Sequence, residues 1–294
     1  MKTILVTGRN GQVGWELRRT LSPLGKTITI DVDDLDLTQP EMIRSFVRSI
    51  SGLSLIVNPA AYTNVDQAED EPEIAGKINR DAPAVLAEES KKLGIPMIHY
   101  STDYVFDGQK ETPYLETDPT GPLGVYGVTK LEGEQAVCAI NPKHIVFRLC
   151  WVYGLRGKNF FLTMLRLAKQ GVVPKVVDDQ FGAPTWSRMI AEATASVAGI
   201  LMQNPERNDW GLYHLAAGER THWHEFASEI YRWSNKRFSL NNADPVAIPS
   251  SEYPTKAKRP RFSHLSSEKL ANTFGIQLPG WEEQLRLVQE DWAT

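Results

Sequence analysis

The sequence predicts an α/β fold, with a doubly wound parallel sheet followed by a smaller C-terminal part. Short runs of β-branched residues alternate with amphipathic helical patterns through the first half of the chain. A glycine-rich turn comes directly after the first of these runs. Beyond about residue 150 the alternation loosens, and proline and glycine separate the helical patterns.

The expected strands are short apolar runs at 3–7, 27–32, 55–57, 96–101 and 144–150. Helical patterns occupy the intervals between them, at 13–24, 41–49 and 82–93. Because crossovers between parallel strands are right-handed, this order places helices on both faces of one sheet. We therefore expect residues 1–150 to form the doubly wound domain, with later segments returning to it.

Residues 151–294 are expected to form mainly a part that covers a substrate. Helical patterns at 159–169, 187–202 and 222–233 are joined by connections that carry proline and glycine. The polar, proline-bearing stretch 249–260 is typical of a surface loop or cleft wall, and 281–292 has the spacing of a terminal amphipathic helix.

Composition excludes several classes of protein. The 294 residues carry a net charge of −4 without a dense run of lysine and arginine, which argues against nucleic-acid binding. No apolar run approaches the roughly 20 residues of a membrane span, so we expect a cytoplasmic protein with no membrane partner. Cys138 and Cys150 are too few for a disulfide framework, and His222 and His224 lack further ligands, so no metal site is expected.

The turn Gly8-Arg9-Asn10-Gly11-Gln12-Val13-Gly14 links the first expected strand to the first expected helix. Glycines at Gly8, Gly11 and Gly14 permit a tight turn and let a pyrophosphate approach the N-terminus of the helix. This context predicts a dinucleotide-binding site on a Rossmann-type sheet.

Two charged residues leave the choice of dinucleotide open. Asp31 closes the second expected strand, about 20 residues beyond the turn, where a carboxylate accepts hydrogen bonds from ribose hydroxyls. That position favours NAD. Arg9 in the turn is suited to a 2′-phosphate or, equally, to a place on the solvated surface, so the sequence admits both NADPH and NADH.

Candidate catalytic residues follow the fourth expected strand. Thr102 and Asp103 lie at its carboxyl end, where open α/β sheets bind ligands. Tyr126 and Lys130 are four residues apart and share one helix face, so the ammonium is expected to lower the pKa of the phenol. The tyrosine then serves as a general acid.

With these motifs in place, the chain resembles the extended short-chain dehydrogenase/reductase family, and within it the dTDP-4-dehydrorhamnose reductases. The resemblance covers nearly the whole chain, and its marks are the glycine turn with Trp15-Glu16, Ala60-Ala61-Tyr62-Thr63, Val65-Asp66, the segment 101–106, the segment 126–130, Trp151-Val152-Tyr153-Gly154 and the segment 179–185. It implies NAD(P)H-dependent reduction of the 4-keto group of dTDP-4-dehydro-L-rhamnose to dTDP-L-rhamnose, within rhamnose and cell-surface polysaccharide biosynthesis. Tyr126 would donate the proton, assisted by Thr102 and Lys130.

The resemblance also implies a set of binding residues. Cofactor contacts would fall on Gly11, Gln12, Val13, Asp31, Asp36, Leu37, Ala61, Tyr62, Thr63, Tyr126 and Lys130. Contacts to the nucleotide-sugar substrate would fall on Thr102, Asp103 and Trp151. Arg259 matches a family arginine whose forked guanidinium suits a sugar diphosphate, whereas its residue type alone would place it on the surface.

Two other functions share these motifs. A nucleotide-sugar dehydratase or epimerase uses the same scaffold, but dehydratases commonly carry Thr-Asp-Glu where this chain has Thr102-Asp103-Tyr104. A non-catalytic subunit, like the regulatory subunit of methionine adenosyltransferase, also resembles this family.

The oligomeric state is open between a monomer and a homodimer. A magnesium-bridged dimer, a trait of some family members, uses glutamates that Glu16 and Glu290 match. Arg188 stands where a third carboxylate is wanted, and a guanidinium repels Mg²⁺, so we expect no such bridge here.

Overall fold

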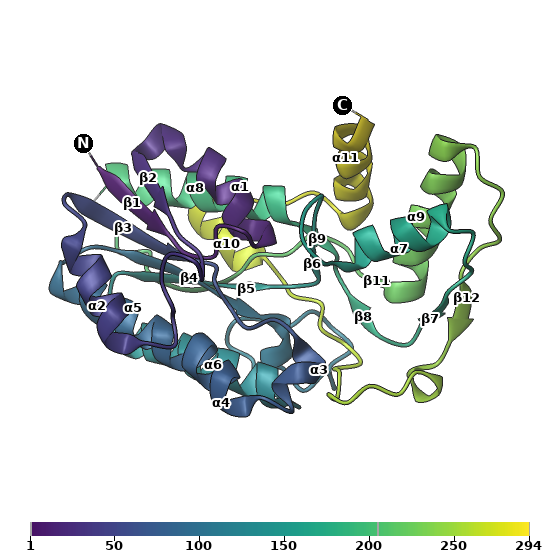
Figure 1. Cartoon of the computed structure of the whole chain (residues 1–294), viewed down its shortest axis with the longest axis horizontal. Helices are drawn as coiled ribbons and strands as arrows, with labels where there is room; N and C mark the ends of the chain where they lie inside the picture. Colours follow the sequence, from purple (N-terminus) through teal and green to yellow (C-terminus); the bar gives the residue numbers. More distant parts are fainter. Residues whose placement is uncertain (1, 205, 294) are drawn as a thin grey trace.

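The computed structural model describes residues 2–204 and 206–293 of the chain. Its centre is a six-stranded parallel sheet in the order β10-β5-β4-β3-β1-β2 (Figure 1). The strands are β1 Thr3–Val6, β2 Lys26–Thr29, β3 Leu53–Asn58, β4 Met97–Thr102, β5 His144–Leu149 and β10 Gly211–His214. The chain runs from β1 outward to β2 and then crosses to β3 on the other side, so β1 and β3 flank the point where the strand order reverses.

Helices cover both faces of this sheet (Figure 1). One face packs on α1 Gln12–Thr20, α8 Ser187–Gln203 and α10 Glu268–Phe274, and the other on α2 Pro40–Ser49, α5 Ala82–Lys92 and α6 Val125–Ile140. Alternation along β1 explains the division, because Ile4 and Val6 join the first core and Leu5 joins the second. Both faces are therefore buried, as parallel sheets require.

The expected fold class is confirmed, and the five predicted strands and seven predicted helical patterns all correspond to elements of the structure. The sequence analysis did not identify β10, which pairs with β5 at the edge of the sheet. Since β10 and α8 lie beyond residue 150, the second half of the chain contributes directly to the main sheet and its covering layer.

A second lobe follows β5 and has its own hydrophobic core (Figure 1). Its helices are α7 Phe160–Lys169, α9 Trp223–Phe238 and α11 Trp281–Ala293, and its short strands are β6 Val152–Tyr153, β7 Lys175–Val177, β8 Phe181–Gly182, β9 Thr185–Trp186, β11 Thr221–His222 and β12 Val246–Ile248. The strands pair as β6 with β9, β7 with β12 and β8 with β11. Two short helices, α3 Val65–Ala68 and α4 Pro72–Gly76, lie between β3 and α5 in the chain.

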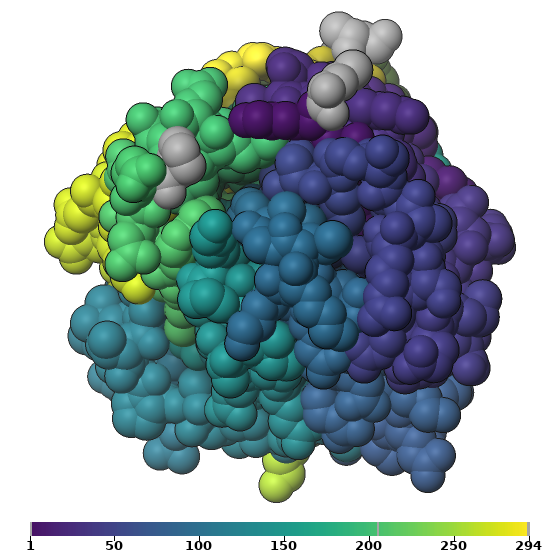
Figure 2. Space-filling view, turned by 90° about the vertical axis from the view of Figure 1, so that its left-hand side faces the viewer, coloured from purple at the N-terminus to yellow at the C-terminus, as the bar shows by residue number. Residues whose placement is uncertain are grey.

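The end of the molecule where β1 begins joins segments that are distant in the sequence (Figure 2). The green segment near residue 200 lies against the purple N-terminal segment in that view. Lys2 Nζ donates a hydrogen bond to the carbonyl of Met202 at 3.1 Å, and Thr20 Oγ1 donates to the carbonyl of Ala191 at 3.1 Å. These contacts hold α8 against α1.

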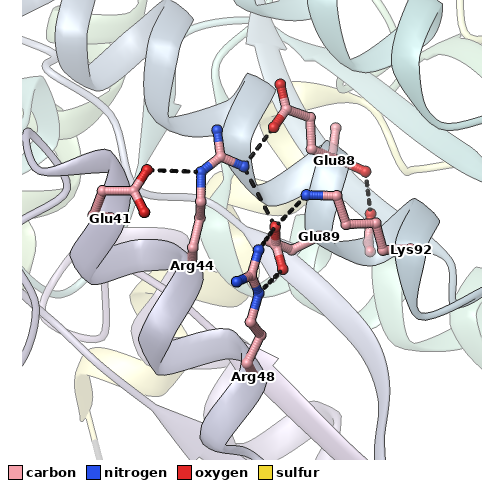
Figure 3. A network of polar contacts seen from close by, with 8 residues as sticks. Glu41, Arg44, Arg48, Glu88, Glu89 and Lys92 are labelled. Atoms are coloured by element: carbon pink, nitrogen blue, oxygen red, sulfur yellow. Dashed lines mark hydrogen bonds and ion pairs between the residues drawn. The ribbon is translucent and has the colours of Figure 1, made fainter.

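An ion-pair network ties α2 to α5 on the other face (Figure 3). The Glu89 side chain is buried and accepts hydrogen bonds from Arg48 at 2.7 and 2.9 Å and from Lys92 at 2.8 Å. Arg44 bridges Glu88 at 2.5 Å and Glu89 at 3.3 Å. Hydrogen bonding from Arg48 and from Lys92 lowers the pKa of Glu89 to about 2, against the opposing effect of burial.

We predict that Glu89→Gln lowers the free energy of unfolding by about 2 to 3 kcal/mol at pH 7, because the amide forms no ion pair. The folded pKa of Glu89 lies below its unfolded value of 4.5, so its stabilisation is complete above about pH 5. It is lost as the pH falls through about 2. Urea unfolding at pH 7 and at pH 3 measures the free energy of unfolding of parent and variant. The difference between the two proteins at pH 3 should be about half of the difference at pH 7.

The matched control is Glu88→Gln, because Glu88 is more exposed and contacts Arg44 alone in this network. Glu88→Gln should lower the free energy of unfolding by less than about 1 kcal/mol. If Glu89→Gln lowers the free energy of unfolding equally at both pH values, the ionised Glu89 carboxylate does not supply this stabilisation.

Candidate functional site

A cavity of about 820 Å³ opens at the carboxyl edge of the sheet, beside the point where the strand order reverses. Open α/β sheets bind their ligands at this place. The cavity runs from the glycine turn, past the ends of β3 and β4, to the first residues of α7 and α9 in the second lobe. One continuous site therefore joins the predicted cofactor and substrate residues.

The glycine turn forms a cradle that side chains would fill. Gly8 adopts a φ of +62°, and a Cβ there would lie 3.0 Å from the backbone of Ala60. A Cβ on Gly14 would lie 2.0 Å from the carbonyl oxygen of Gly8. Gly11 precedes the first residue of α1, where unpaired N–H groups suit a phosphate anion. Gln12 and Val13 continue the wall of the cavity. This cradle fits a dinucleotide.

Asp31 lies beside the turn as the sequence predicted, but its carboxylate is already hydrogen-bonded. It accepts from the backbone N–H of Asn10 at 2.7 Å and of Val32 at 2.8 Å. The Arg9 guanidinium turns toward the carboxylate of Asp34 at 2.8 Å. Asp31 thus braces the turn, and Asp34 holds the Arg9 guanidinium beside the end of β2, outside the lining of the cavity.

The other predicted cofactor residues lie around the same end of the cavity, with one exception. Asp36, Leu37, Ala61 and Thr63 line it. Tyr62 does not, because its hydroxyl donates to Glu71 at 2.6 Å, and this hydrogen bond raises the pKa of Tyr62 to about 12. The backbone of Tyr62 is fixed by a hydrogen bond from its N–H to Asn79 Oδ1 at 2.8 Å.

The three candidate catalytic residues converge on the cavity. Thr102 ends β4 and donates to Asp103 Oδ1 at 2.9 Å, while Tyr126 and Lys130 project from α6. Lys130 is buried, and its Nζ donates to the carbonyl of Tyr100 at 2.5 Å. The helical spacing of Tyr126 and Lys130 therefore brings both to the end of β4.

The expected effect of Lys130 on Tyr126 is not found in this structure. Burial raises the pKa of Tyr126 to about 12, with hydrogen bonding to Thr102 opposing the rise and the charge of Asp103 adding to it. Lys130 makes no such contribution, since its ammonium is drawn to the Tyr100 carbonyl and burial lowers its own pKa to about 8. The phenol consequently holds its proton at neutral pH.

Asp103 begins the short 3₁₀ turn Asp103–Val105 and is buried beside Thr102. Burial raises the pKa of Asp103 to about 6, although hydrogen bonds from Ser263 and Thr102 oppose the rise. The Tyr104 ring meets the Tyr126 ring edge to face at 5.7 Å.

Trp151 lines the cavity beyond the end of β5 in an unusual conformation. Its φ of +43° is left-handed, which costs a bulky L-residue about 1 to 2 kcal/mol. Its ring stacks on Trp223 with centroids 3.6 Å apart and planes inclined by 8°. Neither Trp223 nor Phe160, which also lines the cavity, was identified from the sequence. Their helix-start positions resemble those of ordinary core aromatics, so no sequence signal marked them.

Arg259 lies beside α3, outside the lining of the cavity. Its Nη2 donates to Asp66 Oδ2 at 2.8 Å. Asp66 also accepts from the N–H of Ala257 at 3.0 Å, which fixes this segment against α3. The guanidinium is paired with this carboxylate through Nη2, while its buried Nε has no hydrogen-bond partner among the described residues, so a diphosphate contact at Arg259 stays a prediction.

The residues considered for metals have other partners. His222 caps α9 by accepting from the N–H of Glu225 at 3.2 Å, and His224 Nε2 lies 2.9 Å from the carbonyl of Pro245. Arg188 forms ion pairs with Glu16 at 3.6 Å and with Asp291. In the described residues, no cluster of three or more histidine, cysteine or acidic side chains suits a metal ion.

Comparison with known proteins identifies the family to which this chain belongs. The profile of the RmlD substrate binding domain matches residues 1–293. A dTDP-4-dehydrorhamnose reductase of Burkholderia thailandensis is 45% identical over 98% of this chain and 98% of its own. A solved dTDP-4-dehydrorhamnose reductase of Clostridium acetobutylicum superposes with a TM-score of 0.89, at 34% identity over 99% of this chain and 100% of that one.

A third relative, a dTDP-4-dehydrorhamnose reductase of Bacillus anthracis solved in complex with NADP, has a TM-score of 0.86 and 31% identity, over 99% of this chain and 100% of its own. These matches extend over 98% or more of both chains in each case. Within the described residues, no helix has the length and apolarity to span a membrane. The chain therefore belongs to the dTDP-4-dehydrorhamnose reductase family and is an oxidoreductase.

Proposed function

We propose that this chain uses NADPH to reduce the 4-keto group of dTDP-4-dehydro-L-rhamnose, giving dTDP-L-rhamnose, with Tyr126 as the proton donor. The observation that carries the proposal is the single cavity that holds the glycine turn at one end and Thr102, Tyr126 and Lys130 at the other. The substrate is inferred from the names of the relatives.

The chemistry requires a proton and a stabilised oxygen at the ketone. The reduced nicotinamide supplies the hydride when the cofactor is bound. Tyr126 has a pKa near 12 in this buried setting, so it reaches the reaction with its proton in place. Thr102 and Lys130 line the same cavity, where Thr102 would hydrogen-bond the developing oxyanion and Lys130 would hold the cofactor ribose.

NADPH is the cofactor we favour over NADH. The Bacillus anthracis relative was solved with NADP. In this chain Arg9 is held beside the end of β2 by Asp34, where a 2′-phosphate can compete for the guanidinium. Residues 1–150 would bind the cofactor, and residues 151–294 would supply most of the sugar-nucleotide surface, with Trp151 and Trp223 facing the cavity.

The alternatives receive less support. Tyr104 stands where a dehydratase would need a second carboxylic acid, and its ring packs on Tyr126. A purely regulatory subunit has no need for a proton-bearing tyrosine beside a dinucleotide cradle. The direct test is the loss of NADPH absorbance when the keto-sugar nucleotide is added to the purified protein.

Tyr126→Phe should lose about 100- to 10,000-fold in kcat, because it removes the hydroxyl that donates the proton and keeps the ring. Single-turnover oxidation of bound NADPH measures this step apart from product release. NADPH affinity should remain close to that of the parent.

Thr102→Val is the matched comparison, since it removes a hydrogen-bonding hydroxyl from the same site without removing the acid. Its loss in the single-turnover rate should be smaller. A Tyr126→Phe enzyme that turns over at the parent rate would mean that another group supplies the proton.

Gly11→Val should abolish NADPH binding in isothermal titration calorimetry. A Cβ on Gly11 already lies 3.3 Å from the Gly8 carbonyl oxygen, and the added methyl groups enter the space for the pyrophosphate. Gly11→Ala, which adds the Cβ alone, should weaken binding less. Parent-like NADPH affinity in a folded Gly11→Val protein would refute the cofactor site.

We further propose that no magnesium ion bridges two copies of this chain. The Arg188 guanidinium lies between the carboxylates of Glu16 and Asp291, which disfavours a divalent cation there. Glu290 pairs instead with Arg286. Sedimentation velocity should give the same oligomeric state in Mg²⁺ and in EDTA. Arg188→Glu, which replaces the cation with a third carboxylate, should gain measurable Mg²⁺ binding, and a chelator-sensitive dimer of the parent would contradict the proposal.

A further inference from the structure

Trp151 adopts a backbone conformation that its own residue type disfavours. Its φ of +43° lies in the left-handed region, where a large side chain is rarely found. Within the described residues only Glu219 and Ser239 share a positive φ among the non-glycine residues, and neither lines the cavity. Contacts made by the indole must therefore hold Trp151 in place.

Trp223 supplies the main contact. The two indole rings stack with centroids 3.6 Å apart and planes within 8° of parallel. Trp223 is the first residue of α9, and His222 caps that helix by accepting from the N–H of Glu225 at 3.2 Å. The Phe160 ring lies 4.6 Å from the Trp223 ring. The start of α9 thus presents Trp223 in a fixed position.

Gly182 provides the space that the indole occupies on the side of β8. A Cβ on Gly182 would lie 2.4 Å from Cε2 and 2.7 Å from Nε1 of Trp151. The Trp151 carbonyl is also held, since it accepts from the N–H of Thr185 at 3.2 Å. The indole is therefore confined by two elements of the second lobe, the start of α9 at Trp223 and the glycine of β8 at Gly182.

We propose that Trp223 is a positioning residue, which holds Trp151 in its left-handed conformation so that the indole forms the wall of the sugar-binding end of the cavity. Both tryptophans line the cavity that also holds Thr102 and Tyr126. The inference rests on the proposed function for the identity of the substrate. It explains why a glycine occupies position 182, where the indole of Trp151 leaves no room for a Cβ.

A double-mutant cycle tests whether Trp223 acts through Trp151. Trp223→Leu should raise the KM for the keto-sugar nucleotide about 3- to 10-fold, the equivalent of one aromatic stack, and change kcat and NADPH affinity little. Trp223→Phe, which keeps an aromatic ring at this position, should have a KM close to that of the parent. In the Trp151→Leu background, Trp223→Leu should have almost no further effect on KM. Additive effects would overturn the proposal, because they would mean that Trp223 contacts the substrate by itself.

Trp233→Leu is the matched control on the same helix. Trp233 packs against Phe161 and Trp292 in the second core and does not line the cavity. Its loss should lower thermal stability and leave KM unchanged. If Trp233→Leu raises KM as much as Trp223→Leu does, the effect is general loosening of the lobe, and the positioning role is wrong.

Circular dichroism gives a readout that does not depend on catalysis. The near-UV spectra of the parent, Trp223→Leu, Trp151→Leu and the double variant form a second cycle, because indoles stacked at 3.6 Å contribute to the spectrum as a pair. The change in the double variant should differ from the sum of the two single changes, and strictly additive spectral changes would overturn the positioning role. If the spectra are non-additive but the parent leaves NADPH unoxidised by the keto-sugar nucleotide, the proposed function fails while the stacked pair stands.

Discussion

The arrangement of the whole site depends on the close approach of the glycine turn to the end of β3. Gly8 contacts the backbone of Ala60, and Gly14 lies over the Gly8 carbonyl at a distance that leaves no room for a Cβ. Because of this contact, α1 begins immediately at the carboxyl edge of the sheet, and its N-terminus opens into the cavity. A larger side chain at Gly14 would push α1 away and close the space that the cradle provides.

The same helix start connects the two lobes. Gln12, the first residue of α1, donates from Nε2 to the carbonyl of Val152 at 3.3 Å and accepts from Asn159 Nδ2 at 2.9 Å. Asn159 in turn caps α7 by accepting from the N–H of Leu162 at 3.0 Å. The glycine turn and the wall of the second lobe are thus linked through side-chain amides. A cofactor at the turn and a substrate at α7 would share these supports, which explains why one cavity serves both.

Burial has opposite consequences at different positions in this protein. Glu89 is buried among cations, and its pKa falls because the charged form is paired. Tyr126 is half-buried, and its pKa rises because the phenolate would be desolvated. The first arrangement stabilises the packing of α2 on α5. The second leaves Tyr126 protonated at the end of the cavity that also holds Thr102.

Short sequence patterns were sufficient to predict much of the fold and many of the residues that line the cavity. Buried parallel strands appear as short apolar runs, so the sequence identified the strands that become β1 to β5. The tight glycine turn was predicted because its backbone requirements are local, and the four-residue spacing of Tyr126 and Lys130 was sufficient to place both on one helix.

Contacts between distant segments were decided only by the tertiary structure. The edge strand β10 is recognisable only beside β5, Arg259 is engaged by Asp66 from 193 positions away, and the Lys130 ammonium turns to the Tyr100 carbonyl. Trp223 lines the cavity because the second lobe brings the start of α9 against Trp151, which lies two residues beyond the end of β5. Backbone preference and helical spacing are properties of neighbouring residues and can be read along the chain. The partner of a charged or aromatic side chain depends on which distant segments packing brings together, and the sequence by itself does not contain that information in any local pattern.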